Sequence, residues 1–432
     1  MTTAETHRPS GGAFSALASR SYRIYLMGQS LANTGTWMQS IAQDWLIFSL
    51  THNSTAVGIT MALQFLPILL LGMHAGAVAD RVSKRRILLT TQTLNLVATG
   101  ALAAVTVAGA VTSVDVYAFA LVSGVIFAFD SPARQSFVTE VVPEDKLRAA
   151  ISLTAAVFQA TRLIGPAIAS VLIVTAGSGW VFAANAALYL GPTIGLLRLR
   201  PSDLRGAAAA GSARTPGAVR EAIRYVRGKP DVLWTIFLVG MLGSFGLNFP
   251  VVLTAMAKST FGGGASTYGL FNIVVGLGSA AGAVLAGSGA RPRTRIVVGA
   301  AILFGALQAA AALAPDLAVF LVLIAAMGFA NLVCQALANT SVQLEVDPEL
   351  RGRVMGLYML VFVGGTPIGA PIVGAVTSRY GARDGMLLCG VIPVLAALVT
   401  AAAIYGRRRR ARLAGLASLA ETGPLPMLAG RA

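Results

Sequence analysis

The chain carries a short basic stretch, Gly76-Ala-Val-Ala-Asp80-Arg81-Val-Ser83-Lys84-Arg85-Arg86, between two apolar runs at 56–79 and 87–109. Each run is long enough for a helix to cross a bilayer, which takes about 20 apolar residues. A short, strongly basic connection is typical of a loop on the cytoplasmic side of a membrane. Together the three segments predict a helix–loop–helix unit of a membrane protein.

Apolar runs of this kind recur along the whole chain and are separated by polar segments. The expected spans are residues 22–49, 56–79, 87–109, 114–135, 150–175, 180–198, 232–256, 267–288, 296–314, 317–340, 354–378 and 385–405. A backbone in lipid must satisfy its own hydrogen bonds, so only helices or a closed barrel can cross. The runs do not alternate apolar and polar residues as barrel strands do. The sequence therefore predicts an all-α polytopic membrane protein with twelve transmembrane helices.

The composition excludes several classes of protein. Of the 432 residues, 56% are hydrophobic and 12% are charged, whereas a soluble domain carries about 25% charged residues. The two cysteines, Cys334 and Cys389, lie in apolar runs, so neither a disulfide framework nor a zinc cluster is expected. The sequence shows no set of nucleophile, base and oxyanion donors and no nucleotide-binding loop. It therefore predicts a protein that is not an enzyme and that holds no cofactor and no metal.

The net charge of +16 is distributed as expected for a membrane topology and not for nucleic-acid binding. With the N-terminus in the cytoplasm, 29 Lys and Arg residues fall on the cytoplasmic side and 3 on the opposite side. Positive residues concentrate in the cytoplasmic loops of membrane proteins. We therefore expect a bacterial inner-membrane protein with both termini in the cytoplasm and no nucleic-acid partner.

The expected domain organisation has two halves of six spans. A cytoplasmic tail (1–21) precedes an N-terminal bundle (22–198), and a cytoplasmic linker (199–230) leads to a C-terminal bundle (231–406) and a basic tail (407–432). The arginines of this last tail are expected to fix the topology. A second interpretation is that they bind anionic lipid headgroups. The protein is expected to be a monomer.

An internal repeat relates the two halves. Glu140-Val-Val-Pro143-Glu144 follows the fourth span, and Glu345-Val-Asp-Pro348-Glu349 follows the tenth span 205 residues later. The same offset relates Pro166 to Pro371. Six spans separate the copies, so both halves have the same orientation in the membrane. Parallel repeats of this kind bind their substrate between the halves, near the bilayer midplane.

The stretch 76–86 resembles the signature loop of the major facilitator superfamily, Gly-x-x-x-Asp-Arg/Lys-x-Gly-Arg/Lys-Arg/Lys, with Ser83 in place of the usual second glycine. Other segments are similar to the branch that holds the enterobactin exporter and related effluxers. They are Trp37-Met-Gln39, Leu50-Thr51, Asp130-Ser-Pro132-Ala-Arg134-Gln, Arg162-Leu-Ile-Gly165-Pro166 and Arg351-Gly-Arg353-Val. The resemblance implies two parallel-repeat six-helix bundles and secondary transport by alternating access.

In this superfamily the signature loop acts as a latch of the cytoplasmic gate. The residues that would form it here are Gly76, Asp80, Arg81, Lys84 and Arg85. Asp80 is expected at the end of the second span, where it can accept hydrogen bonds from Arg134 or from the N-terminus of a neighbouring helix. A simpler interpretation treats the basic residues of the loop as topology signals alone.

Two ionisable residues lie deep in the expected spans, where such residues are costly and mark ion or substrate pathways. Asp44 shares a helix face with Asn33 and Trp37 and could carry a coupling proton. Arg162 is expected about 18 Å into the fifth span at 1.5 Å per residue, and its permanent charge needs a counter-ion. Asp44 and Asp130 are the acids available. The alternatives are that Arg162 binds an anionic group of the substrate and that Asp44 is a fixed partner or lies in the outer vestibule.

Two further sets of residues are assigned to conformational change. Asp130, Arg134 and Glu140 are expected to form a charge relay with Asp80 that links the gate to the bundle. Gly165 and Pro166 resemble the Gly-Pro motif in the fifth span of antiporters, and Gly369 and Pro371 occupy the equivalent place in the second half. Because proline removes a backbone hydrogen bond, each proline permits a kink.

Polar and aromatic residues from both halves are expected to line a substrate cavity. They are Asn33, Trp37, Asn248, Asn272, Asn331, Gln335 and Tyr358. The second half holds uncharged polar residues in its later spans, so it is expected to form a neutral, hydrogen-bonding wall opposite a charged first half. For any single residue of this set, packing between helices is the simpler interpretation.

Three functions fit these observations to different degrees. The first is a proton-coupled exporter of amphipathic small molecules (a drug, siderophore or secondary metabolite), which the intramembrane charges and the resemblance favour. The second is a facilitator or importer of a polar small molecule, which would need more hydrogen-bonding groups in both halves. The third is a membrane enzyme or a receptor that does not transport. The expected partners are thus a small-molecule substrate, protons and the lipid bilayer.

Overall fold

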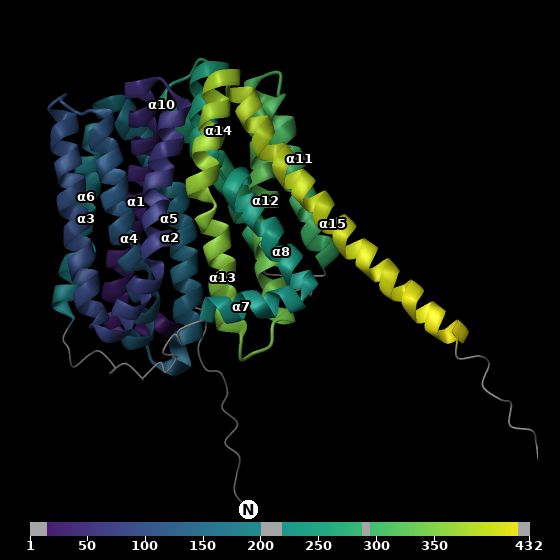
Figure 1. The fold of residues 1–432 in the computed structure, drawn as a ribbon. Helices are drawn as coiled ribbons and strands as arrows, with labels where there is room; N and C mark the ends of the chain where they lie inside the picture. Colours follow the sequence, from purple (N-terminus) through teal and green to yellow (C-terminus); the bar gives the residue numbers. More distant parts are fainter. Residues whose placement is uncertain (1–14, 200–217, 287–293, 422–432) are drawn as a thin grey trace, which may run out of the picture.

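The structure, a computed structural model, describes residues 15–199, 218–286 and 294–421. Almost all of these residues are helical, and none of them forms a β-strand. Figure 1 shows the N-terminal half (purple to blue) and the C-terminal half (teal to yellow) as two neighbouring helical bundles. The prediction of an all-α membrane protein built from two bundles is confirmed.

The N-terminal bundle consists of six long helices. They are α1 (Arg20–Thr51), α2 (Ser54–Arg81), α3 (Lys84–Val107), α4 (Ser113–Val141), α5 (Leu147–Ala176) and α6 (Ser178–Arg198). Local sequence sets several of the starts: the side chains of Ser19 and Asn53 accept hydrogen bonds from the first turns of α1 and α2, and Thr112 and Asp115 form a capping box at α4. These side chains satisfy backbone N–H groups that a helix start leaves without partners.

Eleven helical segments of the described residues are long and apolar enough to cross a membrane, and α1 is not one of them. Its 32 residues span about 48 Å at 1.5 Å per residue, so its length is sufficient and its polarity is the exception. The polar side chains are buried against neighbouring helices: Thr99 Oγ1 and Asn185 Nδ2 donate to Gln39 Oε1 at 3.2 and 2.6 Å. Polar groups that face the interior of a bundle do not prevent a helix from spanning. α1 is therefore the twelfth span.

The C-terminal bundle contains two interrupted spans. Its helices are α8 (Pro230–Met241), α9 (Phe249–Ala255), α10 (Ala265–Ala286), α11 (Thr294–Ala312), α12 (Leu317–Glu345), α13 (Arg351–Gly364), α14 (Thr366–Tyr380) and α15 (Ala382–Glu421). The seventh span comprises α8, the π-helical η4 (Leu242–Gly246), α9 and the π-helical η5 (Met256–Thr260). The eleventh span comprises α13 and α14. The sequence predicts each span as one apolar run, 232–256 and 354–378, with a kink permitted at Pro371 in the second.

The internal repeat is visible in the dimensions of the helices. α4 and α12 each contain 29 residues, and α5 and the segment Arg351–Tyr380 each contain 30. The glutamate near the end of each long helix reaches the start of another helix. Lys84 Nζ donates to Glu140 Oε1 at 2.7 Å, and Thr294 Oγ1 donates to Glu345 Oε1 at 3.4 Å. The two halves thus share both topology and a local contact.

The two ends of the molecule differ in character. We name the end that holds Arg81–Arg86 and α7 (Ala218–Gly228) the basic end, and the end that holds His52, Gly177 and Gly381 the distal end. α7 lies across the basic end of the C-terminal bundle, and α15 extends past that bundle on the same side (Figure 1). Much of the expected basic tail is therefore the end of α15.

Some expected segments lie outside the described residues. They are the larger part of the N-terminal tail (1–14), the first part of the linker (200–217), the eighth-to-ninth-span loop (287–293) and the chain end (422–432). The domain boundaries given above stay predictions.

Candidate functional site

The two bundles contact each other through a small set of helices. α2 packs against α14 and α9, α5 packs against α10, and α1 meets α9 and α10. At the distal end, Thr55 N and Oγ1 lie 3.1 and 3.2 Å from Ser378 Oγ, and Ser378 Oγ donates to Asn53 Oδ1 at 2.6 Å. Further along, Gly58 packs against Ala370. These contacts close the distal side of the boundary between the bundles.

Glycines make the close approach of the helices possible. A Cβ on Gly58 would overlap the carbonyl oxygen of Ala370, and a Cβ on Gly269 of α10 would overlap the hydroxyl of Ser170 on α5. Small residues at such points let helix backbones approach closely in membranes. The distal contact between the bundles therefore depends on residues without side chains.

Toward the basic end the bundles separate. The last glycine contacts between them join Leu69 to Gly364 and Leu163 to Gly276. On the basic side of these residues, no hydrogen bond or ion pair joins the bundles within the described ranges. The basic-end half of α5 is correspondingly open, with 43% of Phe158 exposed. The boundary is thus closed distally and open on the basic side.

Asp44 forms a hydrogen bond across the two bundles. The hydroxyl of Tyr268, on α10, donates to Asp44 Oδ2, on α1, at 2.9 Å. Asp44 is 5% exposed and Tyr268 is fully buried. Trp45 stacks on the Tyr268 ring with 6.5 Å between ring centroids. A carboxyl group predicted to lie inside the membrane is therefore part of the contact that holds the distal side closed.

Tyr268 is a functional candidate that sequence reasoning missed. A tyrosine near the start of an apolar helix is common, because its ring is amphipathic. The sequence alone carried no signal that this hydroxyl meets Asp44, since the two residues lie in different halves.

Arg162 has neither of the acidic partners expected for it. Asp44 bonds to Tyr268 and Asp130 bonds to Arg134, so the prediction of an Asp44 or Asp130 counter-ion is wrong. The guanidinium carbon instead lies 5.5 Å from the ring centroid of Trp37. Trp37 in turn packs edge-on against Phe158, with centroids 5.8 Å apart. Arg162 therefore rests on an aromatic surface at the open part of the boundary.

Asp130 and Arg134 form a polar cluster inside the N-terminal bundle. Asp130 is 1% exposed and accepts hydrogen bonds from Thr91 Oγ1 at 2.7 Å, Gln92 Nε2 at 3.2 Å and Arg134 Nε at 2.7 Å. Arg134 also donates to Asn33 Oδ1 at 3.4 Å. Asn33 is thus bound within this cluster, in contrast to its expected place in the substrate cavity.

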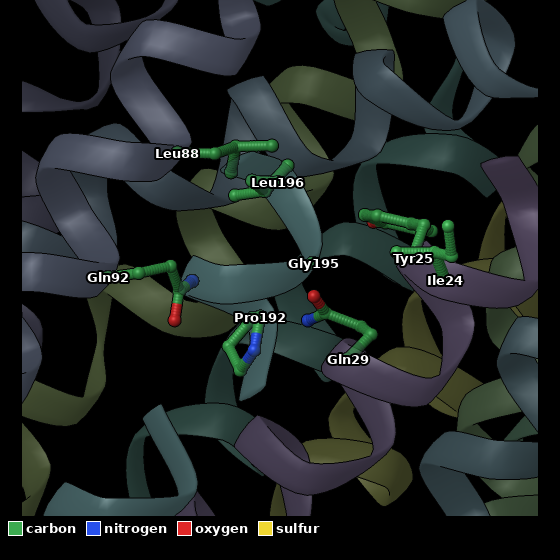
Figure 2. Close-up of a pocket in the computed structure, with 8 residues that line it drawn as sticks. All are labelled: Ile24, Tyr25, Gln29, Leu88, Gln92, Pro192, Gly195 and Leu196. Carbon is green, nitrogen blue, oxygen red and sulfur yellow. The ribbon is translucent and has the colours of Figure 1, made fainter. Parts of the chain in front are cut away.

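A small cavity lies beside this cluster (Figure 2). Its lining residues are Ile24, Tyr25, Gln29, Leu88, Gln92, Pro192, Gly195 and Leu196. Gln29 and Gln92 approach Pro192 from opposite sides in Figure 2. The volume is about 10 Å³, which is near the minimum for one water molecule. This cavity is too small for an organic substrate.

The signature loop is tied to its own bundle. Besides the Lys84–Glu140 ion pair, Arg85 Nε donates to the Leu196 carbonyl at 2.9 Å. A cation at the carbonyl end of α6 is favourable because those carbonyls lack helical partners. Asp80 and Arg81 are exposed, and neither has a hydrogen-bond or ion-pair partner in the described part of the chain.

Two expectations about the gate residues are therefore wrong for this conformation. Asp80 does not accept a hydrogen bond from Arg134. Asp130–Arg134 and Lys84–Glu140 are separate pairs and do not form one relay with Asp80. Gly76 is buried in α2, and its role in the latch stays a prediction.

The expected kinks are placed differently in the two halves. α5 runs continuously through Pro166, and Gly165 packs against α1 at Trp37. In the second half the helix is interrupted at Gly365, with Pro367 in the first turn of α14. Gly369 and Pro371 lie inside α14, and a kink at Pro371 stays a prediction. Gly369 packs against the backbone of Ser244.

The expected polar wall of the second half mostly bonds to itself. Asn248 is fully buried and donates to the carbonyls of Ser244 and Phe245 at 2.7 and 3.0 Å. It thereby satisfies carbonyls near the interruption of the seventh span, and a role in lining a substrate cavity stays a prediction. Gln335 donates to Asn331 at 2.8 Å.

The remaining two residues of that set also make local contacts. Asn272 donates to the Tyr268 carbonyl at 2.9 Å. Tyr358 is 3% exposed and stacks on Phe362 with ring centroids 6.4 Å apart. A role of either residue in binding substrate stays a prediction.

Two six-helix bundles that meet at a boundary open on one side have the arrangement of the major facilitator fold. A variant of the nucleoside transporter NupG has this fold, with a TM-score of 0.71 and 14% identity over 88% of this chain and 99% of that chain. At this identity the likeness shows the fold alone.

The family model described as transmembrane secretion effector matches residues 11–418, and the chain belongs to this family. It is 27% identical to the multidrug efflux pump Tap of Mycolicibacterium fortuitum over 86% of this chain and 94% of that protein. It is 28% identical to the staphyloferrin A transporter of Staphylococcus aureus over 39% of this chain, and that match spans only 42% of the relative's length.

The chain is thus a multi-pass membrane protein whose relatives are transporters and not enzymes.

Proposed function

We propose that this protein is a secondary active exporter of amphipathic small molecules that couples efflux to proton entry by alternating access. The observation that carries the proposal is the buried hydrogen bond between Asp44 and Tyr268 across the two bundles. A titratable group at a moving boundary can link its proton to the movement. Membership of a secretion family and the efflux-pump relative support export as the direction.

The orientation follows from the charge distribution. Lys84, Arg85 and Arg86 lie at the basic end, together with α7 and the end of α15. By the positive-inside rule this end faces the cytoplasm. The conformation described here is then open to the cytoplasm and closed to the outside.

Burial of Asp44 suggests how a proton would drive the cycle. Closing the distal boundary removes Asp44 from water, which costs on the order of several kcal/mol for a charged carboxylate and much less for a neutral acid. A proton that binds from the outside therefore permits distal closure. Release of this proton to the cytoplasm, with binding of substrate on the basic side, completes an antiport cycle.

The signature loop would act in the other half of the cycle. Asp80 and Arg81 are exposed at the basic end of α2 in this conformation. When the basic end closes, the C-terminal bundle approaches them, and they can form the latch that the family resemblance implies. Lys84 and Arg85 would keep the loop fixed to its own bundle through Glu140 and Leu196.

The alternative, import or facilitated passage of a polar molecule, has less support in the contacts. Asn331, Gln335 and Asn272 use hydrogen-bonding groups within their own helices. Each of these residues thus uses one donor or acceptor on a neighbour in its own helix. An amphipathic substrate needs fewer hydrogen-bonding groups.

The test is gradient-driven export by cells that express the wild type, Asp44→Asn or the control Asp145→Asn. Asp145 is exposed at the basic end and lacks a partner in the described residues. Export of ethidium and of the anion dansyl-glycine is followed with and without a protonophore. We expect protonophore-sensitive export of at least one probe, its loss in Asp44→Asn and no change in Asp145→Asn. Gradient-driven export by Asp44→Asn at the wild-type rate would contradict the proposal.

A further inference from the structure

Arg162 is an intramembrane cation without an acid. No carboxylate of the described residues lies within ion-pairing distance of its guanidinium, and none of its N–H groups has an acceptor there. The two acids that the sequence offered as counter-ions have other partners: Asp44 bonds to Tyr268, and Asp130 bonds to Arg134. The positive charge at this position is therefore uncompensated within the part of the chain that the structure describes.

The position of Arg162 is at the point where the bundles part. Its neighbour Leu163 packs against Gly276 of α10, and Ser170, two turns further toward the distal end, packs against Gly269. On the basic side, Phe158 is 43% exposed. Arg162 itself is half-buried. It thus lies where a molecule that enters from the basic side reaches the closed distal contact.

A lone cation at this depth is costly in free energy unless another group compensates its charge. Arginine keeps its charge at all physiological pH values, and an unpaired charge in a membrane protein costs on the order of several kcal/mol. The face of Trp37, 5.5 Å from the guanidinium carbon, offsets about 0.5–2 kcal/mol of this cost. The N–H donors at the edge of the guanidinium have no hydrogen-bond acceptor among the described residues, so this edge is available to a ligand.

The available edge fits one chemical class of ligand. The planar fork of N–H donors matches the two oxygens of a carboxylate in a bidentate pair. The Trp37 ring lies next to the guanidinium and packs against Phe158, with 5.8 Å between the two ring centroids. These two rings offer contact to an apolar group. We propose that Arg162 binds the carboxylate of an amphipathic substrate while Trp37 and Phe158 contact its apolar part. This proposal rests on the proposed exporter function and narrows its substrate class to organic anions and zwitterions.

The experiment compares two probes that differ only in charge. The full-length protein is placed in nanodiscs of phosphatidylcholine alone, so that no anionic lipid can occupy the site. Dansyl-glycine and its neutral amide, dansyl-glycinamide, are titrated by fluorescence. Because a hydrogen-bonded ion contributes about 1.5–3 kcal/mol, we expect the carboxylate to bind about tenfold or more tightly than the amide.

Three variants test whether Arg162 causes this preference. Arg162→Gln should bring the ratio of the two affinities to about one, and Arg162→Lys, which keeps the charge but loses the planar fork, should restore only part of it. Arg224→Gln, an exposed arginine of α7 without a partner in the described residues, should keep the wild-type ratio. The ratio is measured within each protein, so partial loss of folded protein does not alter it.

Two outcomes would overturn the proposal: equal binding of both probes by the wild type, or a carboxylate preference that persists in Arg162→Gln. Gradient-driven export of ethidium or dansyl-glycine by the wild type tests the exporter function separately. If that export is present while the two probes bind equally, the anion site is wrong and the exporter function stands.

Discussion

Among single residues, the proposed proton coupling depends on one hydrogen bond between the halves. Tyr268 donates to Asp44 at 2.9 Å in a region that excludes water. A hydrogen bond contributes about 0.5–1.5 kcal/mol between neutral groups and about 1.5–3 kcal/mol to a charged group. Loss of the Tyr268 hydroxyl should therefore weaken distal closure most when Asp44 is ionised.

Tyr268→Phe is expected to reduce gradient-driven export severalfold at alkaline pH and less at acidic pH. The phenyl ring keeps the stacking with Trp45, so the loss is that of the hydroxyl alone. Initial export rates between pH 6 and pH 8 check this. Tyr25→Phe is the matched control, because Tyr25 is also buried and no described residue hydrogen-bonds to its hydroxyl. Equal effects of the two substitutions would contradict the assignment.

The sequence identified the individual charges but not their partners. Asp44 and Arg162 are evident because ionisable residues are rare in spans. Their partners depend on which helix faces are turned toward each other, and helix rotation and tilt are set by packing. For this reason the expected Asp44–Arg162 pair is replaced by Asp44–Tyr268, and Arg162 lies on Trp37. Asp130 and Arg134 are four residues apart on one helix, so the sequence alone places them on the same helix face.

At the scale of elements, α7 attaches the linker to the C-terminal bundle. Its Glu221 pairs with Arg353 at the start of α13, and the Tyr225 hydroxyl accepts from the backbone N–H of Asp347 at 3.0 Å. Just after α7, Lys229 pairs with Asp347 at 2.9 Å. These contacts fix α7 to the connection between α12 and α13, which the sequence did not predict.

The attachment of α7 is expected to weaken below about pH 4. The hydrogen bond from Lys229 lowers the pKa of Asp347 and raises the pKa of Lys229. The stabilisation from Asp347 is complete above the ordinary aspartate pKa and is lost as pH falls through the lowered value. That from Lys229 is lost only as pH rises through its raised value. Because both groups are exposed, the effect is small.

Hydrogen exchange of α7, corrected for intrinsic rates, checks this pH dependence. Protection of Ala218–Gly228 should fall between pH 6 and pH 3 in the wild type. In Asp347→Asn, protection should already be lower at pH 6 and should change less with pH, while Arg224→Gln should behave as the wild type. An unchanged profile in Asp347→Asn would show that this pair does not hold α7.

Two spans are interrupted at positions that their hydropathy does not predict. The seventh and eleventh spans are apolar throughout, so their hydropathy predicts continuous helices. Asn248 and Pro250, and Gly365 and Pro367, mark the actual interruptions. Proline cannot donate a backbone hydrogen bond, and its ring clashes with the preceding turn. Pro371, by contrast, lies inside α14 and does not end the helix.

Gly58→Ala is expected to disfavour distal closure. The added methyl group overlaps the Ala370 carbonyl, so α2 and α14 must separate, at a cost of about 1–3 kcal/mol. Disulfide formation between Thr55→Cys and Ser378→Cys measures closure, since both native cysteines are buried. The yield should fall in Gly58→Ala and stay unchanged in Gly72→Ala, where a Cβ meets nothing within 4 Å. Equal yields would contradict the role of Gly58.

At the scale of the whole molecule, the sequence predicted the architecture and missed the conformation. Hydropathy and the 205-residue repeat are properties of each half alone, so they predict two similar bundles. The repeat is confirmed by the equal lengths of α4 and α12. Which side of the boundary is closed depends on contacts between the halves, such as Thr55 with Ser378, and these leave no pattern in a single sequence.

The most direct test of the proposed coupling asks whether the proton on Asp44 controls distal closure. Spin labels on His52→Cys and Arg379→Cys, both exposed beside the Asn53–Ser378 contact, report the distance across the distal boundary in liposomes. Distances are compared at pH 5 and pH 8 for the wild type and for Asp44→Asn in this background.

We expect the population with a short distance between the two spin labels to grow in the wild type as pH falls, because a neutral Asp44 is less costly to bury. In Asp44→Asn, whose amide is neutral at every pH, the short distance should dominate at both pH values. A pH-dependent shift of the same size in Asp44→Asn would contradict the claim that Asp44 couples the proton to distal closure.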